Sequence, residues 1–272
     1  MPEKITDNII TEEITIRASS LSPYADCPRR SAARMFKQGL IDSGYEFRQT
    51  EPGIGAVIGT SVHEAVSYIH NTEDTLSNTI ELGIEKFRSQ IENGVLYDDT
   101  SPGPTFAEKQ IQQITKAYYY IVAPKTNPVY VEHELTATMP GNVKLIGHPD
   151  DIESDKIRDL KTGVKAGKNY GQMGGYSLLA GARGIISDSP QLIIDWIPRV
   201  SKNKPSAEPI EIHYDPELCE LEAWSIMCRI IDEYKSFLTS GDIKSFPANY
   251  MSYMCSAKYC IAHGTDFCPL SK

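Results

Sequence analysis

The stretch LIGHPDDIESDKIRDLKTG, residues 145–163, carries charged residues that an ordinary pair of strands does not need. Apolar and polar residues alternate on both sides of a polar turn, which predicts two strands. Residues i and i+2 lie on the same face of a strand, so Asp159 and Lys161 point the same way and Leu160 points into the opposite layer. If the two halves pair as a hairpin, Asp150 approaches Asp159.

Two neighbouring carboxylates repel each other unless a cation lies between them. Oxygen ligands suit Mg²⁺ or Mn²⁺, and such an ion lowers the pKa of a bound water and neutralises charge on a phosphate. Lys161 would then orient the attacking water or stabilise the transition state. The alternative is a solvated hairpin in which Asp159 and Lys161 form an exposed ion pair, and the D-x-K spacing alone leaves both readings open.

The order of the other elements predicts an α/β fold with a mixed central sheet flanked by helices. Helices are expected at 57–70, 75–91, 106–122 and 170–184, and a long one is expected from Pro216 to Gly241. Strands are expected at 129–138, 143–153, 156–163, 191–200 and 208–215, with one short helix near 19–36 and a polar leader that adds a further strand. The apolar face of the long helix is predicted to be Leu218, Leu221, Trp224, Cys228 and Ile231.

The length of 272 residues fits one domain. We divide residues 1–272 into a helical part at 17–125, a sheet core at 126–215, the long helix at 216–245 and a cysteine-containing tail at 246–272. A net charge of −9 argues against broad binding of nucleic acid on a basic surface, but not against an enzyme that grips a few phosphates. No membrane span, signal peptide or P-loop is recognised, so a cytoplasmic protein without its own helicase is expected.

Four motifs follow one another in a characteristic order. They are GTSVHEA with His63, GHPD with Gly147 and Asp150, DLKTG with Asp159 and Lys161, and QMGGY with Gln172 and Tyr176. Each motif is weak alone, but the ordered set resembles the RecB-like branch of the PD-(D/E)xK nuclease superfamily. The resemblance implies a restriction-endonuclease-like core, and it also fits a phage-encoded protein in a bacterial host.

The resemblance assigns a role to each motif residue. The metal ligands would be His63, Asp150, Asp159 and the backbone carbonyl of Leu160; Lys161 would be the catalytic lysine, and Gln172 and Tyr176 would order the site and contact the DNA backbone. Gln172 and Tyr176 lie one helical turn apart and so share a face. The family often has a further glutamate upstream, for which Glu134 is preferred over Glu132, while alternation points Asp151 away.

Four cysteines require a separate explanation. Cys27 precedes the core, and the tail has the spacing Cys255-x4-Cys260-x7-Cys268. Clustered cysteines inside cells usually hold a metal or cluster. In RecB-like exonucleases one cysteine before the core and three after it ligate a [4Fe–4S] cluster, although the tail spacing there is tighter. A zinc site that uses His263 in place of Cys27 and a site without metal remain alternatives. The other two, Cys219 and Cys228, are expected to be buried in the long helix.

The resemblance implies a metal-dependent DNA exonuclease that serves recombination, repair or DNA processing and acts on single strands or DNA ends. The basic residues expected to touch the DNA backbone are Lys165, Lys168, Arg199 and Lys202. Two rival functions remain, a sequence-specific endonuclease and a non-catalytic module that binds DNA or a partner. A homo-oligomer or a partner protein of recombination or replication also remains open.

Overall fold

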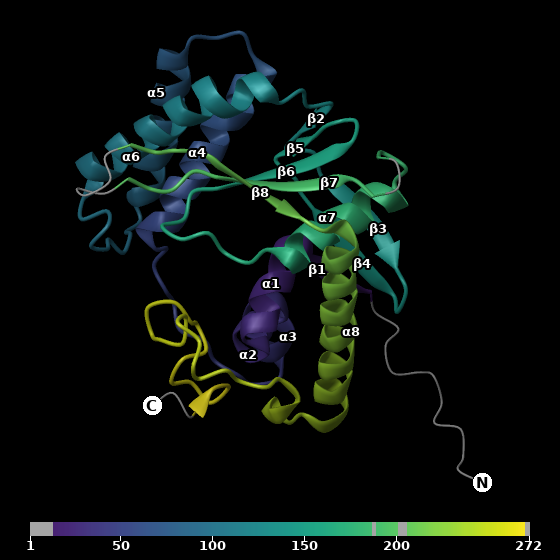
Figure 1. Ribbon diagram of the computed structural model, residues 1–272. Coiled ribbons are helices and arrows are strands. Elements are labelled where there is room, and N and C mark those ends of the chain that lie inside the picture. The colour runs from purple at the N-terminus through teal and green to yellow at the C-terminus, as the bar shows by residue number, and fades with distance from the viewer. Residues whose placement is uncertain (1–12, 187–188, 201–205, 270–272) are drawn as a thin grey trace.

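Two layers of helices enclose the β-strands of this protein (Figure 1). The computed structural model describes residues 13–186, 189–200 and 206–269. One layer contains α4 (Ile54–Asn71), α5 (Leu76–Ile91) and α6 (Pro104–Ala117), and the other contains α1 (Ala18–Asp26), α7 (Tyr170–Ala182) and α8 (Pro216–Ser240). Within those described ranges, no helix combines the length and the apolar character needed to cross a membrane.

The strands form two hydrogen-bonded sheets. The larger has the order β2 (Tyr130–Val131), β5 (Asp151–Ile152), β6 (Lys156–Lys161), β7 (Gln191–Trp196) and β8 (Ile210–Tyr214). The smaller has the order β1 (Ile14–Arg17), β4 (Val143–Gly147) and β3 (Leu135–Met139). The β6–β7 and β1–β4 pairs are parallel, and the other pairs are antiparallel. Mixed sheets flanked by helices confirm the predicted α/β fold class.

Two of the expected strands, 129–138 and 143–153, are interrupted. The segment 129–138 forms β2 and β3, and 143–153 forms β4 and β5. Pro149 has no N–H to donate to a ladder, which ends β4. Glu132 has a φ of 47°, in the left-handed region that a strand cannot continue through. The two interruptions place Glu132 and Asp150 next to each other, since the Glu132 N–H donates to the Asp150 carbonyl (2.9 Å).

The helices before the sheet differ in their bounds. The N-terminal segment forms α1, α2 (Pro28–Met35) and α3 (Lys37–Asp42), where one short helix was expected. The first long helix, α4, begins at Ile54 instead of Val57, and α6 continues as one π-helical turn at Tyr118–Val122.

The buried face of α8 was predicted wrongly at three of its five positions, whereas Ile231 is buried and Trp224 packs against the core. Leu218 and Leu221 are 55% and 64% exposed, and Cys228 is also exposed. The buried residues are Cys219, Ala223, Ile226, Met227, Ile230, Ile231 and Phe237. Cys219, whose burial was predicted, faces α7, and the contact between these two helices decides the rotation of α8.

Glycine makes this helix contact possible. A Cβ on Gly174 of α7 would lie 1.9 Å from the carbonyl oxygen of Cys219, so the two backbones touch. A Cβ on the next residue, Gly175, would lie 2.9 Å from the Cβ of Ala18 in α1. The paired glycines of the QMGGY motif therefore let α7 pack directly against α8 and α1, which fixes the helix that carries Gln172 and Tyr176.

We predict that Gly174→Ala lowers the free energy of unfolding by at least about 3 kcal/mol, because the new methyl group overlaps backbone that cannot move aside. Gly181→Ala is the matched control in the same helix, since a Cβ there meets nothing within 4 Å. It should raise stability by up to about 1 kcal/mol. Urea denaturation of both variants measures the difference, and equal stability of the two would contradict the packing described here.

Candidate active site

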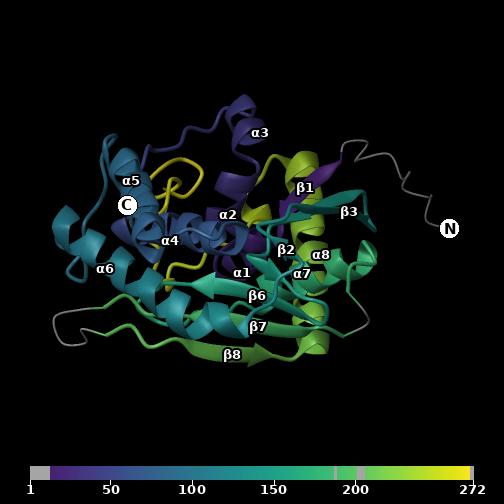
Figure 2. The same ribbon diagram turned by 90° about the horizontal axis from the view of Figure 1, so that it is seen from above.

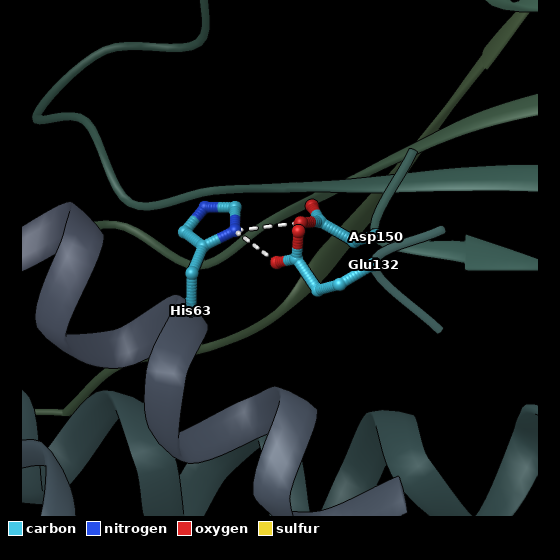
Figure 3. Close-up of side chains that lie close together, drawn as sticks. All are labelled: His63, Glu132 and Asp150. Atoms are coloured by element: carbon cyan, nitrogen blue, oxygen red, sulfur yellow. Dashed lines mark hydrogen bonds and ion pairs between the residues drawn. The ribbon is translucent and has the colours of Figure 1, made fainter. Parts of the chain in front are cut away.

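Three side chains from distant parts of the chain converge beside the start of β5. His63 projects from α4 toward Asp150, which directly precedes β5, and Glu132, which directly follows β2 (Figure 3). The His63 Nδ1 lies 2.6 Å from Asp150 Oδ1 and 3.6 Å from Glu132 Oε1. One ligand atom from each residue lies within 4.8 Å of the other two. An imidazole and two carboxylates at this spacing can bind a divalent metal.

The carboxylates of β5 and β6 are joined through the backbone. Asp150 Oδ2 accepts a short hydrogen bond from the N–H of Leu160, so Asp150 is fixed beside the strand that carries Asp159. Asp159 and Lys161 form an ion pair on the same face, and Leu160 packs into the opposite apolar layer, as predicted. Asp150 and Asp159 are 7% and 2% exposed, so the carboxylates lie in a largely desolvated centre.

Helix α7 covers the same centre from the other side. Gln172 Nε2 donates to Asp159 Oδ1 (3.3 Å) and to the Tyr176 hydroxyl (2.8 Å). The Tyr176 hydroxyl donates to the carbonyl of His148 (3.1 Å). A Cβ at Gly147 would lie 2.9 Å from the Tyr176 ring, so the glycine of the GHPD motif is needed for this ring to pack.

Negative potential dominates the electrostatics of the centre. Burial disfavours charge on His63, but Asp150, Glu132 and Asp159 outweigh it and raise its pKa to about 10. Burial likewise opposes the charge of Lys161, yet Asp159 and Asp150 raise its pKa as well. The pKa of Asp159 is itself raised, chiefly by burial. Because the carboxylates stabilise the positive charge of His63 and Lys161, they also favour a bound metal ion. The metal ion must displace the proton of His63 in order to bind to its imidazole.

All the motif residues meet in one cavity. It is lined by Arg17, Ser19, His63, Glu132, Ile146, Gly147, His148, Asp150, Asp159, Lys161, Gln172 and Tyr176. Arg17, at the start of α1, was not identified from the sequence, because the short β1 that positions it pairs with β4 far along the chain. The lining of the cavity therefore combines carboxylates with the basic side chains of Arg17, His63 and Lys161.

A family model described as the PD-(D/E)XK nuclease superfamily matches residues 15–218 of the chain. The chain belongs to the PD-(D/E)XK nuclease superfamily. A structure from Eubacterium rectale, provisionally described as an exonuclease, covers 93% of each chain with a TM-score of 0.53 and 12% identity. A second structure, LHK-Exo in complex with dAMP, covers 68% of this chain and 96% of that chain, with a TM-score of 0.31 and 12% identity. No curated protein matches this nuclease-superfamily member in sequence.

Of the two glutamates upstream of the GHPD motif, the structure brings Glu132 to His63 and Asp150, whereas Glu134, which was preferred from the sequence, does not line this cavity. Glu134 is an exposed residue whose carboxylate lies 3.1 Å from His148 Nε2. The left-handed backbone at Glu132 disrupts the alternation on which the sequence argument relied. Membership of the superfamily and the His63, Glu132 and Asp150 group together support divalent metal binding.

A second layer of buried polar residues lies behind the site. The Tyr118 hydroxyl donates to Asp151 Oδ2 (2.9 Å) and lies 2.7 Å from His70 Nε2. Burial is the largest cause that raises the pKa of Asp151, to about 7. On the adjacent strands Arg158 donates two hydrogen bonds to Asp195 (2.7 and 2.9 Å). No pattern in the sequence indicates these contacts, because charged residues in strands are usually exposed.

The four predicted cysteines also converge, at a separate place. Cys27, Cys255, Cys260 and Cys268 line one small cavity, together with Arg30 and His263. The N–H of Asn249 donates to Cys27 Sγ (3.4 Å), which ties the tail to the start of α2. Burial raises the pKa of Cys255 and Cys260, and the neighbouring thiols Cys268 and Cys27 raise both further. The fold therefore brings together the four cysteines that the sequence singled out.

The basic residues proposed for DNA contact lie in different environments. Lys165 and Lys168 are exposed in the loop between β6 and α7. Arg199 is buried; it pairs with Asp98 (3.4 Å) and donates to the Ser101 hydroxyl (3.0 Å). Lys202 lies outside the described residues.

We predict that Glu132→Gln weakens Mn²⁺ binding at least about tenfold, because it removes a carboxylate ligand from the group around His63. Glu134→Gln is the matched control, two residues away and exposed. Isothermal titration calorimetry with Mn²⁺ measures both variants. Equal weakening by the two substitutions would show that Glu132 has no special place in the site.

We predict that Asp151→Asn gains stability relative to the wild type as the pH rises. An acid whose pKa is about 7 when folded and about 3.9 when unfolded stabilises the fold at low pH, and this contribution is lost as the pH rises through 7. The free energy of unfolding of Asp151→Asn, relative to that of the wild type, should rise by about 2–3 kcal/mol between about pH 5 and about pH 8. Denaturation in EDTA at the two pH values tests this, and a constant difference would contradict the raised pKa.

Proposed function

We propose that this superfamily member is a metal-dependent DNA exonuclease that acts on single strands or DNA ends in recombination, repair or DNA processing. The observation that carries the proposal is the convergence of His63, Asp150, Asp159 and Lys161 in one cavity. Family membership and fold support a hydrolytic nuclease, and the similarity to a structure provisionally described as an exonuclease supports cleavage from an end.

Each residue of the cavity would have a separate role in phosphodiester hydrolysis. The ligands of Mg²⁺ or Mn²⁺ would be His63, Glu132, Asp150, Asp159 and the backbone carbonyl of Leu160. The bound metal would lower the pKa of a water and neutralise charge on the phosphate. Lys161, held by Asp159, would orient the attacking water or stabilise the developing negative charge. Gln172 and Tyr176 would keep Asp159 in place and contact the DNA backbone.

We predict that Lys161→Ala lowers kcat at least about 100-fold, because the site loses the side chain that would orient the attacking water or stabilise the developing negative charge. The assay uses Mg²⁺ or Mn²⁺ and single-stranded DNA labelled at either the 5′ or the 3′ end, with Lys244→Ala as a surface control that is 86% exposed. Progressive shortening from one end supports the proposal. Cuts at one internal sequence would favour a specific endonuclease instead, and DNA binding without cleavage would favour a non-catalytic module.

We also propose that Cys27, Cys255, Cys260 and Cys268 hold a [4Fe–4S] cluster that fastens the tail to α2. Four partly or fully buried thiols line one cavity, and burial together with the neighbouring Cys268 and Cys27 raises the pKa of Cys255 and Cys260, which supports a positively charged occupant. Zinc, with His263 as one ligand, is the alternative. In either case the role is structural, because the cavity is lined by residues other than those of the catalytic site.

We predict that Cys255→Ser removes most of the bound iron and lowers the melting temperature, because the tail then loses one of four ligands. Cys228→Ser is the matched control, since Cys228 is exposed on α8. Anaerobic purification followed by visible spectroscopy and metal analysis measures the effect. A colourless wild-type protein that contains zinc would contradict the cluster and support the zinc site. A wild-type protein without bound metal would contradict both proposals.

A further inference from the structure

A large groove lies between the beginning of α4 and the C-terminal tail. We call it the tail groove; its lining includes Arg34, Gly55, Lys165, Tyr253, Lys258 and Tyr259. The tail runs beside the segment that leads into α4, as the yellow and dark blue chains in Figure 1 show, and the N–H of Arg48 donates to the carbonyl of Ile261 (2.9 Å). The groove thus has one wall from the nuclease core and one from the tail.

The lining of the tail groove and that of the cavity beside His63 follow one another along α4. Gly55 and Ala56 line the groove, and Gly59 and His63, one and two turns further along the same helix face, line a cavity that also contains Lys161. The loop after β6 also contributes to both cavities. Gly163 lines the cavity that contains His63 and Lys161, and Lys165 lines the tail groove. At 1.5 Å per residue, Gly55 lies about 12 Å from His63 along the helix axis.

The tail wall presents aromatic rings to solvent. Tyr253 is 85% exposed, and its ring centroid lies 6.1 Å from that of Tyr259. Lys258 Nζ lies 5.3 Å from the centroid of the Tyr259 ring. Exposed aromatic rings beside cations are the combination by which proteins bind single-stranded nucleic acid without sequence preference.

The charge of the groove favours an anionic strand. Arg199 and Asp98 neutralise each other within the wall. The remaining cations of the lining, Arg34, Lys165 and Lys258, outnumber its other acids, Glu51 and Asp99. This local excess of positive charge stands out on a chain whose net charge is −9.

We propose that the tail groove binds the single-stranded part of the DNA substrate, with bases stacked on Tyr253 and Tyr259 and phosphates near Arg34, Lys165 and Lys258. The proposal rests on the proposed nuclease function, because the groove and the cavity beside His63 follow one another along α4. At 3.4 Å per stacked nucleotide, the length of about 12 Å along α4 between Gly55 and His63 corresponds to about three to four nucleotides.

The position of the tyrosine wall depends on α2 and on the cysteine cavity. Arg34 Nη2 donates to the carbonyl of Tyr259 (3.0 Å). One turn earlier on α2, Arg30 lines the cysteine cavity and donates to the Ser252 hydroxyl (3.0 Å). Loss of the cysteine-bound group would therefore weaken DNA binding as well as folding.

The test measures DNA binding separately from cleavage. Fluorescence anisotropy in EDTA, in the Lys161→Ala background, reports the Kd of an oligothymidylate of about 12 nucleotides, within the usual range of single-strand sites. Tyr253→Ala with Tyr259→Ala should raise that Kd about tenfold or more, and the paired Tyr→Phe changes should restore it, because phenyl rings still stack. Tyr253→Ala alone, at an 85% exposed position, should show the effect without disturbing the fold.

Tyr120→Ala is the control, an exposed tyrosine beyond the far end of α4 that should leave the Kd unchanged. In a protein that retains Lys161, the double variant Tyr253→Ala, Tyr259→Ala should raise the KM for the oligothymidylate. The same variant should leave the hydrolysis of a trinucleotide unaltered. Tight DNA binding by the alanine pair would overturn the proposal, and the groove would then be a site for another partner, such as a protein segment. Tyrosine-dependent binding by a wild-type protein that cuts no DNA would uphold this inference and refute the nuclease function.

Discussion

The hydrogen bond from the N–H of Leu160 to the Asp150 carboxylate is the contact on which the geometry of the candidate active site depends. It joins the interrupted strand β5 to the continuous strand β6 at the point where β6 carries Asp159 and Lys161. Without it, two buried carboxylates would have no fixed separation, and their repulsion would push the strands apart. The backbone thus holds a concentration of negative charge that His63 and Lys161 balance only in part.

Helix α7 supports this arrangement through contacts made by residues without side chains. Gly174 and Gly175 bring its backbone against α8 and α1, and Gly147 admits the Tyr176 ring against β4. The polar side chains on the opposite face of the helix, Gln172 and Tyr176, are consequently held at hydrogen-bond distance from the strands. Stability and site geometry here depend on the same packing, so the motif residues and the glycines between them act together.

The sequence predicted those parts of the site that follow regular periodicity. Asp159 and Lys161 alternate within one strand, and Gln172 and Tyr176 repeat at one helical turn, so short-range rules placed both pairs correctly. Glu132 escaped prediction because its left-handed backbone interrupts the alternation. The rotation of α8 escaped because the contact that decides it, between Gly174 and Cys219, joins different helices. The tail groove joins residues of α2, α4 and the tail, and no local pattern indicates such contacts.

The first described strand has a consequence for how this chain can be shortened. β1, the purple strand labelled in Figure 2, pairs in parallel with β4, whose other neighbour is β3, so it covers what would otherwise be an open sheet edge. A truncation that begins at Ala18 would leave the β4 backbone unpaired, and unpaired strand edges recruit other chains and aggregate. It would also remove Arg17 from the mouth of the catalytic cavity. An expression fragment that is intended to stay soluble should therefore include β1 and begin well before Ile14, although all the motif residues lie after β1.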